Sequence, residues 1–304
     1  MANISAQSVM ALRKKTGVSM MECKKALVEA EGNEEQAVAI LKEKGASKAA
    51  KKSDRETAEG TALFSGKAYI QLLCETDFVG RNENFAAFAN EILDAVNAGG
   101  IEAGKEFFEA NKAEKMTQLG ENIVLKDLGI LEGDIVSGYV HSDKKTTALV
   151  ALTGGDETLA KDIAMHIVGL KPSVISYKDI DSAKADEETA GRIAAVKEEN
   201  IERGRLGKPL FNIPQFVSQS QITEEILKDI EAKMKEELLA EGKPEAILGK
   251  ILPGKIERFI KDNTSFDKEQ ALLSQDYVKD TSVTIEKLCA DKGATVTGFK
   301  LLLI

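Results

Sequence analysis

The stretch Tyr69-Ile70-Gln71-Leu72-Leu73-Cys74-Glu75-Thr76-Asp77-Phe78-Val79 passes from an apolar run into a polar one within a few residues. Its apolar half has the length and composition of a buried β-strand. The pattern predicts that the strand ends at Glu75 and delivers Asp77 and Phe78 into a polar loop over residues 80–84. Aromatic residues make up only 5% of the chain, and loop positions carried by a rigid strand often have a function. The alternative is that Phe78 folds back onto its own core.

Length and composition indicate a globular protein with more than one domain. A chain of 304 residues, 43% hydrophobic and 30% charged, is long enough to split into two or more domains. No apolar run approaches the roughly 20 residues that cross a bilayer, and the first residues lack a signal-peptide pattern. Three widely spaced cysteines, Cys23, Cys74 and Cys289, predict reduced thiols. We expect a cytoplasmic protein with no membrane contact.

The charge distribution argues against nucleic acid as the main partner. The net charge is −9, whereas phosphate binding needs clustered Lys and Arg. Residues 1–55 differ from the rest, because they carry eleven basic and seven acidic residues, a local balance of +4. A basic head of this kind suits an acidic protein surface, although a solvated tail would have the same composition.

The first 55 residues predict a small helical domain followed by a basic linker. Capping signals at Ser5, Ser19 and Asn33 precede three short amphipathic patterns, of which the last ends near Gly45. Three helices this short bury little surface. The pattern is typical of a bundle like the ubiquitin-associated domain, and residues 48–53 would link it to the body.

The body repeats one order of elements twice: a hairpin, a loop and a helix. The first cycle is predicted at 62–64, 67–74 and 85–98, followed by a charged helix at 105–119 and an apolar run at 122–125. The second is predicted at 135–141, 146–153 and 156–170, and a final strand, 295–301, would pair back into its sheet. These patterns indicate two related α+β subdomains with antiparallel sheets.

The residues between the second cycle and the final strand have a different sequence pattern. Residues 182–203 and 223–240 are charged helical patterns with narrow apolar stripes, and they are predicted to pair as a protruding antiparallel helical hairpin. Between them lies a segment with several large apolar residues and two prolines: Pro209, Leu210, Phe211, Ile213, Pro214, Phe216 and Val217.

The predicted fold class is therefore α+β. We expect four regions: a three-helix domain with its linker, a first core subdomain, a second core subdomain in two pieces, and an inserted coiled-coil-like arm. Their predicted ranges are 1–55, 56–133, 134–181 with 245–304, and 182–244.

Few residues in the chain have the pattern of a catalytic or metal site. His166 shares a helix face with Leu159 and Ile163, which predicts a core histidine, and His141 ends a hairpin without cysteine or acidic neighbours in metal-ligand spacing. Neither a phosphate-binding loop nor a dinucleotide fingerprint is present. We therefore expect no enzyme activity, no cofactor and no metal site.

Several separate motifs, in order over nearly the whole chain, resemble bacterial elongation factor Ts, the guanine-nucleotide exchange factor of elongation factor Tu. They are Leu12-Arg13-x-x-Thr16-Gly17-x-x-Met20-Met21-Glu22-Cys23-Lys24-Lys25-Ala26-Leu27, Ala49-Ala50-Lys51-Lys52, Glu75-Thr76-Asp77-Phe78-Val79, Gly120-Glu121-Asn122-Ile123, Tyr139-x-His141, Ala164-Met165-His166-Ile167 and Gly242-Lys243-Pro244-Glu245. Any one of these motifs alone would be weak.

The resemblance implies a partner, a mechanism and a set of contact residues. Elongation factor Tu would bind through its nucleotide-binding domain and its third domain, and GDP would exchange for GTP as Mg²⁺ is displaced. The residues implied in Mg²⁺ displacement are Thr76, Asp77, Phe78 and Val79. Those implied in docking are Arg13, Met20 and Met21 on the nucleotide-binding domain and His141 on the third domain. The helical arm would also touch the nucleotide-binding domain.

Two departures limit what the resemblance implies. Residues 184–229 form a longer segment than the usual arm, and the chain stops at residue 304, where many relatives add a helical module whose contact is not expected here. Two other functions stay open at this point. One is an adaptor whose three-helix head recruits another partner, and the other is an enzyme with an unusual carboxylate site.

Overall fold

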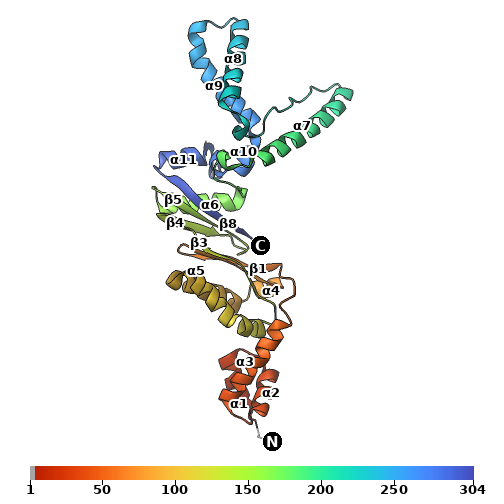
Figure 1. Cartoon of the computed structure of the whole chain (residues 1–304), viewed down its shortest axis with the longest axis vertical. Helices are drawn as coiled ribbons and strands as arrows, with labels where there is room; N and C mark the ends of the chain where they lie inside the picture. Colours follow the sequence, from red (N-terminus) through yellow and green to blue (C-terminus); the bar gives the residue numbers. More distant parts are fainter. Residues whose placement is uncertain (1–3) are drawn as a thin grey trace. The chain divides into compact units, whose positions relative to one another are not determined.

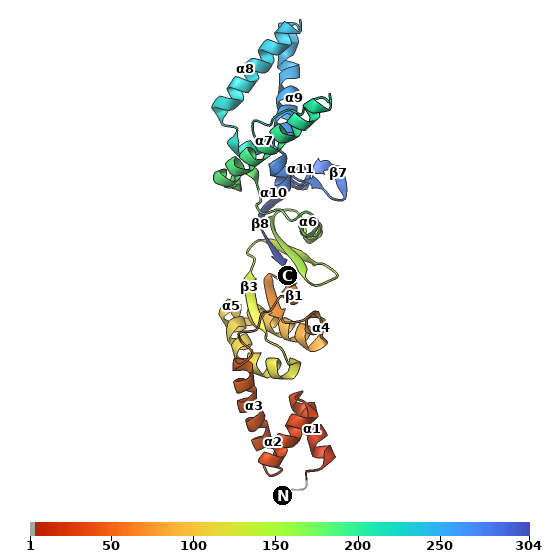
Figure 2. The same ribbon diagram turned by 90° about the vertical axis from the view of Figure 1, so that its right-hand side faces the viewer.

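The computed structural model describes residues 4–304, apart from the side chains at positions 46, 48 and 246. The chain divides into two compact units. The first holds the residues up to Val168 together with Thr297–Ile304, and the second holds Gly169–Val296. Figures 1 and 2 show the elements of each unit in two views. The mixed α+β class predicted from the sequence is confirmed, and the domain boundaries proposed above stay predictions.

The N-terminal head is a three-helix bundle, as predicted. It consists of α1 (Ala6–Thr16), α2 (Met20–Glu29) and α3 (Glu34–Ala50). The side chains of Ser5, Ser19 and Asn33 each accept a hydrogen bond from a first-turn N–H group, which satisfies donors that the helix cannot. The bundle core is apolar and comprises Val9, Leu12, Val18, Cys23, Ala26, Leu27, Ala30, Ala37 and Leu41.

The third helix is longer than its sequence pattern predicts. It continues past Gly45 to Ala50, so most of the predicted linker is helical. Gly45 faces α5 (Glu83–Leu119) at a close approach, because a Cβ there would lie 2.8 Å from Thr117 Oγ1. Ala49 is buried in the core of the next domain. Contact with α5 therefore extends the helix through a residue that usually weakens one.

The first core subdomain is a three-stranded antiparallel sheet packed on a helix. Its strands are β1 (Glu59–Ser65), β2 (Ala68–Cys74) and β3 (Val124–Ile130), in the order β1-β2-β3. Figure 1 shows α5 beside this sheet, and the two share one core. Its large buried side chains are Ile70, Leu72, Phe85, Phe88, Ile92, Leu93, Phe108, Met116 and Ile123. Gly100 breaks α5 with φ 82° and ψ −177°, at the predicted junction between two helices.

The second core subdomain has the predicted hairpin, helix and returning strand. Its elements are β4 (Ile135–Val140), β5 (Thr146–Thr153), α6 (Glu157–Leu170) and β8 (Thr295–Leu303), and the sheet order is β4-β5-β8. Thr147 Oγ1 donates to Ala62 O at 2.6 Å, which ties this sheet to β1. His166 is fully buried on α6, so the prediction of a core histidine is confirmed.

The second unit is mostly helical. Its helices are α7 (Ser182–Arg205), α8 (Glu224–Ala240), α9 (Glu245–Asn263), α10 (Ser265–Gln270) and α11 (Ile285–Asp291). A small ladder joins β6 (Asp276–Tyr277) to β7 (Asp280–Thr284). Three short 3₁₀ turns lie at Tyr177–Asp179, Gln219–Gln221 and Leu272–Ser274. No helix in the described part of the chain is long and apolar enough to cross a membrane.

The helical hairpin is present, but the sequence prediction named the wrong pair of helices. α8 packs against α9 through a shared apolar cluster around Leu238, Leu248 and Leu252 (Figure 1). Gly242 turns the chain between them with φ 77°, and the next N–H bonds back to Leu238 O. Helix α9 was not predicted because Gly249, Pro253 and Gly254 are unfavourable in a helix interior. Packing against α8 outweighs that preference.

Candidate protein-interaction site

The segment that follows β2 is one turn of helix rather than a loop. Thr76 caps this turn, α4 (Asp77–Gly80), by accepting a hydrogen bond from the Val79 N–H group at 3.5 Å. Phe78 is 83% exposed, so the alternative in which it folds back onto its own core is wrong. The next side chain, Val79, is buried in the first subdomain's core. A single helical turn therefore points one apolar side chain outward and the next one inward.

The two side chains beside Phe78 have different surroundings. Asp77 is half-buried, and its carboxylate pairs with Arg81 Nη2 at 3.2 Å. Because this pair lies at the surface, its contribution to stability is small, and the carboxylate stays available to a partner. The inward orientation of Val79 limits what its side chain contributes to a contact surface. It anchors the turn that presents Phe78.

Two glycines allow α4 to lie directly on the sheet. A Cβ on Gly80 would stand 3.2 Å from Gly60 O, so the two backbones are nearly in contact. Gly60 itself has φ 153°, and a Cβ there would meet Leu72 O at 2.1 Å. A side chain at Gly60 would force the strands apart. The turn that carries Phe78 is thus mounted without an intervening layer of side chains.

The carboxylate of Glu121 binds the two residues that precede the turn. Glu121 Oε2 accepts hydrogen bonds from the N–H groups of Glu75 and Thr76, both at 3.0 Å. Glu121 Oε1 accepts one from Thr76 Oγ1 at 2.5 Å. Hydrogen bonds to a charged acceptor are roughly twice as strong as neutral ones. Glu121 therefore orients the residue that caps α4.

A second carboxylate connects the same place to the chain that leaves the head. Glu75 Oε1 accepts a hydrogen bond from the Asn122 N–H group at 2.7 Å and pairs with Arg55 Nη1 at 3.4 Å. The buried Asn122 amide donates to Ser53 O at 3.2 Å and to Arg55 O at 2.8 Å. The turn, the end of α5 and residues 53–55 are therefore parts of one polar network.

Glu121 and Asn122 were missed as functional candidates. Their motif, Gly120-Glu121-Asn122-Ile123, contributed to the family resemblance but implied no role for either residue. The available signal was a polar pair between a helix-ending glycine and a strand. Such a signal does not name the backbone groups that the side chains will reach, because those groups lie more than 40 residues away in sequence.

Cys74, directly behind the turn, is not a reactive thiol. Burial, reinforced by the carboxylates of Glu121 and Glu59, raises the pKa of Cys74 to about 12. Its Sγ donates to Thr76 O at 3.2 Å. Burial likewise raises the pKa of Cys289 to about 11. All three cysteines are free and buried, in agreement with the prediction of reduced thiols.

The head presents some of its predicted docking residues and buries another in part. Met21 is 70% exposed and Arg13 is exposed, whereas Met20 packs partly against the bundle core. Two further exposed apolar residues, Met10 and Val28, were not predicted. Met10 and Arg13 line the same shallow hollow on α1. A basic side chain beside flexible apolar ones suits an adaptable contact with an acidic surface.

His141 lies at the exposed end of the β4–β5 hairpin. Its backbone N–H group donates to Thr146 O at 2.8 Å, and its imidazole ring packs edge-on against the Tyr139 ring, with the ring centroids 6.2 Å apart. The neighbouring Asp143 accepts from the N–H groups of Lys145 and Thr146, and these bonds lower the pKa of its carboxyl. Within residues 4–304, no three His, Cys, Asp or Glu side chains converge as a metal ion would require.

Comparison with known proteins identifies a family. The family model described as Elongation factor TS matches residues 75–210 and 211–304. A protein named elongation factor Ts from Flavobacterium johnsoniae is 44% identical over 99% of this chain and 98% of its own length. Proteins of that name from Wolinella succinogenes and Campylobacter curvus are each 42% identical, over 96% and 97% of this chain and 90% of their own lengths.

Proposed function

The chain belongs to the elongation factor Ts family of translation elongation factors, and from this premise we propose that it binds elongation factor Tu in its GDP form and promotes exchange of GDP for GTP. It does so as a binding protein, with no covalent step. The observation that carries the proposal is Phe78, an aromatic side chain 83% exposed on a turn held by backbone contacts and by the Glu121 carboxylate.

Exchange of this kind is a coupling between two binding sites on the partner. A protein that speeds nucleotide release must bind the empty partner more tightly than the loaded one, and the same factor weakens the nucleotide. Burying Phe78 in the partner contributes about 1.5–3 kcal/mol. If that contact forms only when the nucleotide site is open, it weakens GDP by roughly ten- to a hundredfold.

Phe78 acts as a wedge on the part of the partner that holds Mg²⁺. The ion and the phosphates belong to elongation factor Tu, so this chain needs no metal ligands of its own. Asp77 bonds to the partner and fixes the direction in which the ring enters. Thr76 and Val79 act indirectly, the first as the cap of the turn and the second as its anchor. Without Mg²⁺, GDP dissociates and GTP enters the empty site.

Two other contacts bring the wedge to its place. Arg13 and Met21 on the head dock on the nucleotide-binding domain of elongation factor Tu, with Met20 supporting them from the bundle core. His141 meets the third domain. Because Glu75 and Asn122 tie the chain after the head to the turn, docking of the head also limits the orientations available to Phe78.

The deciding experiment measures release of fluorescent GDP from elongation factor Tu with and without this chain. We expect saturating protein to accelerate release, and chelation of Mg²⁺ to reduce the difference, because the ion would already be absent. An unchanged release rate at saturating protein would rule the proposal out.

The adaptor alternative predicts a different dependence on the head. If the head alone recruits the partner, Arg13→Glu combined with Met21→Glu removes binding completely. If the chain is an exchange factor, the core contact persists and part of the affinity remains. Substitutions are preferable to deleting the head, since Ala49 at the end of α3 belongs to the buried core of the next domain.

A further inference from the structure

The segment 208–217, which joins α7 to the rest of the second unit, contains no helix or strand. α7 ends in a left-handed turn at Gly207, with φ 63°, and the N–H group of Lys208 bonds back to Arg203 O at 2.9 Å. This geometry stops the helix and reverses the chain. Residues 208–217 then return along α7, and they occupy the side of this helix on which residues 223–240 were predicted to pack.

Two side chains of α7 hold the returning segment. The Asn200 side chain donates to Phe211 O at 2.8 Å and accepts from the Phe211 N–H group at 2.7 Å. Arg203 Nε donates to Pro209 O at 2.7 Å, and its guanidinium lies 3.8 Å from the centre of the Phe211 ring. Polar contacts thus attach the first half of the segment to α7, whereas the far end, Val217, is buried in an apolar cluster.

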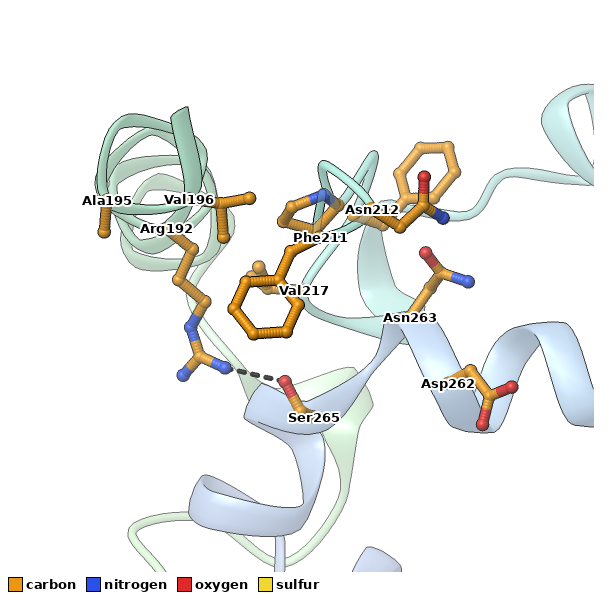
Figure 3. Close-up of a pocket in the computed structure, with 11 residues that line it drawn as sticks. Arg192, Ala195, Val196, Phe211, Asn212, Val217, Asp262, Asn263 and Ser265 are labelled. Atoms are coloured by element: carbon orange, nitrogen blue, oxygen red, sulfur yellow. Dashed lines mark hydrogen bonds between the residues drawn. The ribbon is translucent and has the colours of Figure 1, made fainter. Parts of the chain in front are cut away.

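A pocket of about 360 Å³ lies beside this segment. Its volume is at the lower end of the range for ligand pockets, about 300–1,000 Å³. Figure 3 shows Val196 of α7 and the Phe211 ring facing one another, with Asn212 and Asn263 on the opposite side. Most of the lining is apolar, and Arg192 bonds to Ser265 Oγ at 2.6 Å.

The segment also leaves part of its backbone unpaired. Within the described residues, the N–H groups of Leu210, Asn212, Ile213, Gln215 and Phe216 donate to no protein group. An extended peptide that lies alongside can pair with such groups while its side chains enter adjacent pockets. Large apolar side chains are exposed on the segment, at Leu210, Phe211 and Ile213, and at Leu206 at the end of α7.

The charge of residues 203–223 is opposite to that of the whole chain, whereas the pocket lining carries one residue of each sign, Arg192 and Asp262. Residues 203–223 contain three basic residues, Arg203, Arg205 and Lys208, and no acidic one, whereas the chain has 50 Asp and Glu in 304 residues. A basic, partly apolar surface with unpaired backbone donors is complementary to an acidic peptide with one large apolar side chain.

We propose that residues 208–217 and the pocket beside them form a docking site for an extended, acidic segment of a partner protein. The partner's large apolar side chain fills the pocket between Val196 and Asn263. Its backbone pairs with the free N–H groups of the segment, and its acidic residues lie near Lys208. This surface belongs to the second compact unit and the Phe78 turn to the first, and the proposed docking does not depend on nucleotide exchange.

The experiment selects peptides from a phage-displayed library of random 12-residue sequences on the full chain. We expect the recovered peptides to be acidic and to share a large apolar residue. Val196→Trp, which fills the pocket, should weaken their binding at least tenfold. Lys208→Glu, which leaves the pocket intact, should weaken it severalfold.

Two matched variants control for effects on α7 itself. Ala194→Trp and Lys197→Glu change exposed residues of the same helix outside the pocket lining, and both should bind the peptides as the unchanged chain does. Thermal melting checks that the variants fold. The proposal is overturned if no acidic peptide is enriched, or if the enriched peptides bind Val196→Trp as tightly as the unchanged chain. A concentration-dependent oligomer that Val196→Trp dissociates would assign the surface to a second copy and also overturn it.

Discussion

The Phe78 turn and the segment 208–217 both present a phenylalanine, but they hold it in different ways. Phe78 stands on one helical turn that lies against β1 backbone, and the two residues before this turn donate three hydrogen bonds to the Glu121 carboxylate. Phe211 is 45% exposed on an irregular segment, attached to α7 by Asn200 and Arg203. The backbone contacts and hydrogen bonds around the first phenylalanine, here called the Phe78 mount, fix its position, as a wedge requires. The attachment of Phe211 is adaptable and suits docking of an extended peptide.

The largest effect should come from Phe78→Ala. The proposed wedge loses its buried contact with elongation factor Tu, so accelerated GDP release should fall roughly ten- to a hundredfold. The melting temperature should change by less than about 2 °C, since an exposed side chain contributes little to folding. Fluorescent GDP release and calorimetry measure the two quantities. Leu170→Ala, at another exposed apolar position, should change neither. Equal proportional losses of rate and stability for Phe78→Ala would mean that the slower exchange follows from impaired folding and not from a lost contact with elongation factor Tu.

Glu121→Ala tests whether the Phe78 mount is rigid because of its polar network. It leaves two backbone N–H groups and a hydroxyl without their acceptor, which should cost about 1–3 kcal/mol of unfolding free energy. Accelerated GDP release should also fall, although Glu121 is not expected to touch the partner. Glu121→Gln, which keeps an acceptor oxygen, should restore most of both. The proposed positioning role fails if exchange is unaffected while stability drops by this amount.

Asn200→Ala should loosen the attachment of segment 208–217 to α7 and leave both global stability and GDP release almost unchanged. It removes the paired contacts with Phe211, so the backbone amide of Phe211, which loses its acceptor, should exchange hydrogen faster by about tenfold. Global stability should change by less than about 1 kcal/mol, and GDP release should stay unchanged. Hydrogen exchange followed by mass spectrometry resolves the segment. If protection is lost across α7 as well, the segment is an integral part of the helix packing and not an adaptable attachment.

The smallest effect concerns the far end of segment 208–217. Phe266 donates its N–H to Val217 O there, and Asp267 Oδ2 accepts from the Gln219 N–H group at 2.8 Å. Burial raises the pKa of the Asp267 carboxyl, with hydrogen bonds from Ser218 and Gln219 opposing it. The folded state therefore holds the proton more tightly than the unfolded state. The contribution of Asp267 to stability is greatest at low pH and is lost as pH rises through the raised pKa.

The corresponding measurement is urea denaturation of Asp267→Asn and of the unchanged chain at pH 4 and pH 7. Because the amide that replaces the carboxyl carries no charge at either pH, the variant should gain stability relative to the unchanged chain as pH increases. If the free energy of unfolding of the variant minus that of the unchanged chain stays constant or falls as pH increases, the carboxylate is compensated in the fold. Accelerated GDP release, which depends on Phe78, should be the same in this variant as in the unchanged chain at both pH values.

Much of the architecture was predictable because it depends on local patterns. Apolar runs of strand length and capping residues such as Ser5 and Asn33 identified the head, both hairpins and the helix of each subdomain. The place of Phe78 just after a buried strand left its exposure open, and the family resemblance favoured an exposed position that contacts a partner. Helix α9 was not predicted, because Gly249 and Pro253 oppose a helix when only local preference is considered. Its packing on α8 depends on contacts that the local pattern does not contain.

The sequence by itself determined the family and the order of the elements in the head and the two core subdomains, since motifs and periodicity are properties of neighbouring residues. The tertiary structure alone decided that Glu121 holds the turn and that Val79 points inward. It also decided that α7 is covered by an irregular segment with a pocket beside it. Each of these depends on side chains meeting backbone groups distant in sequence. The energy of such contacts is set by the distance and direction that the whole fold imposes.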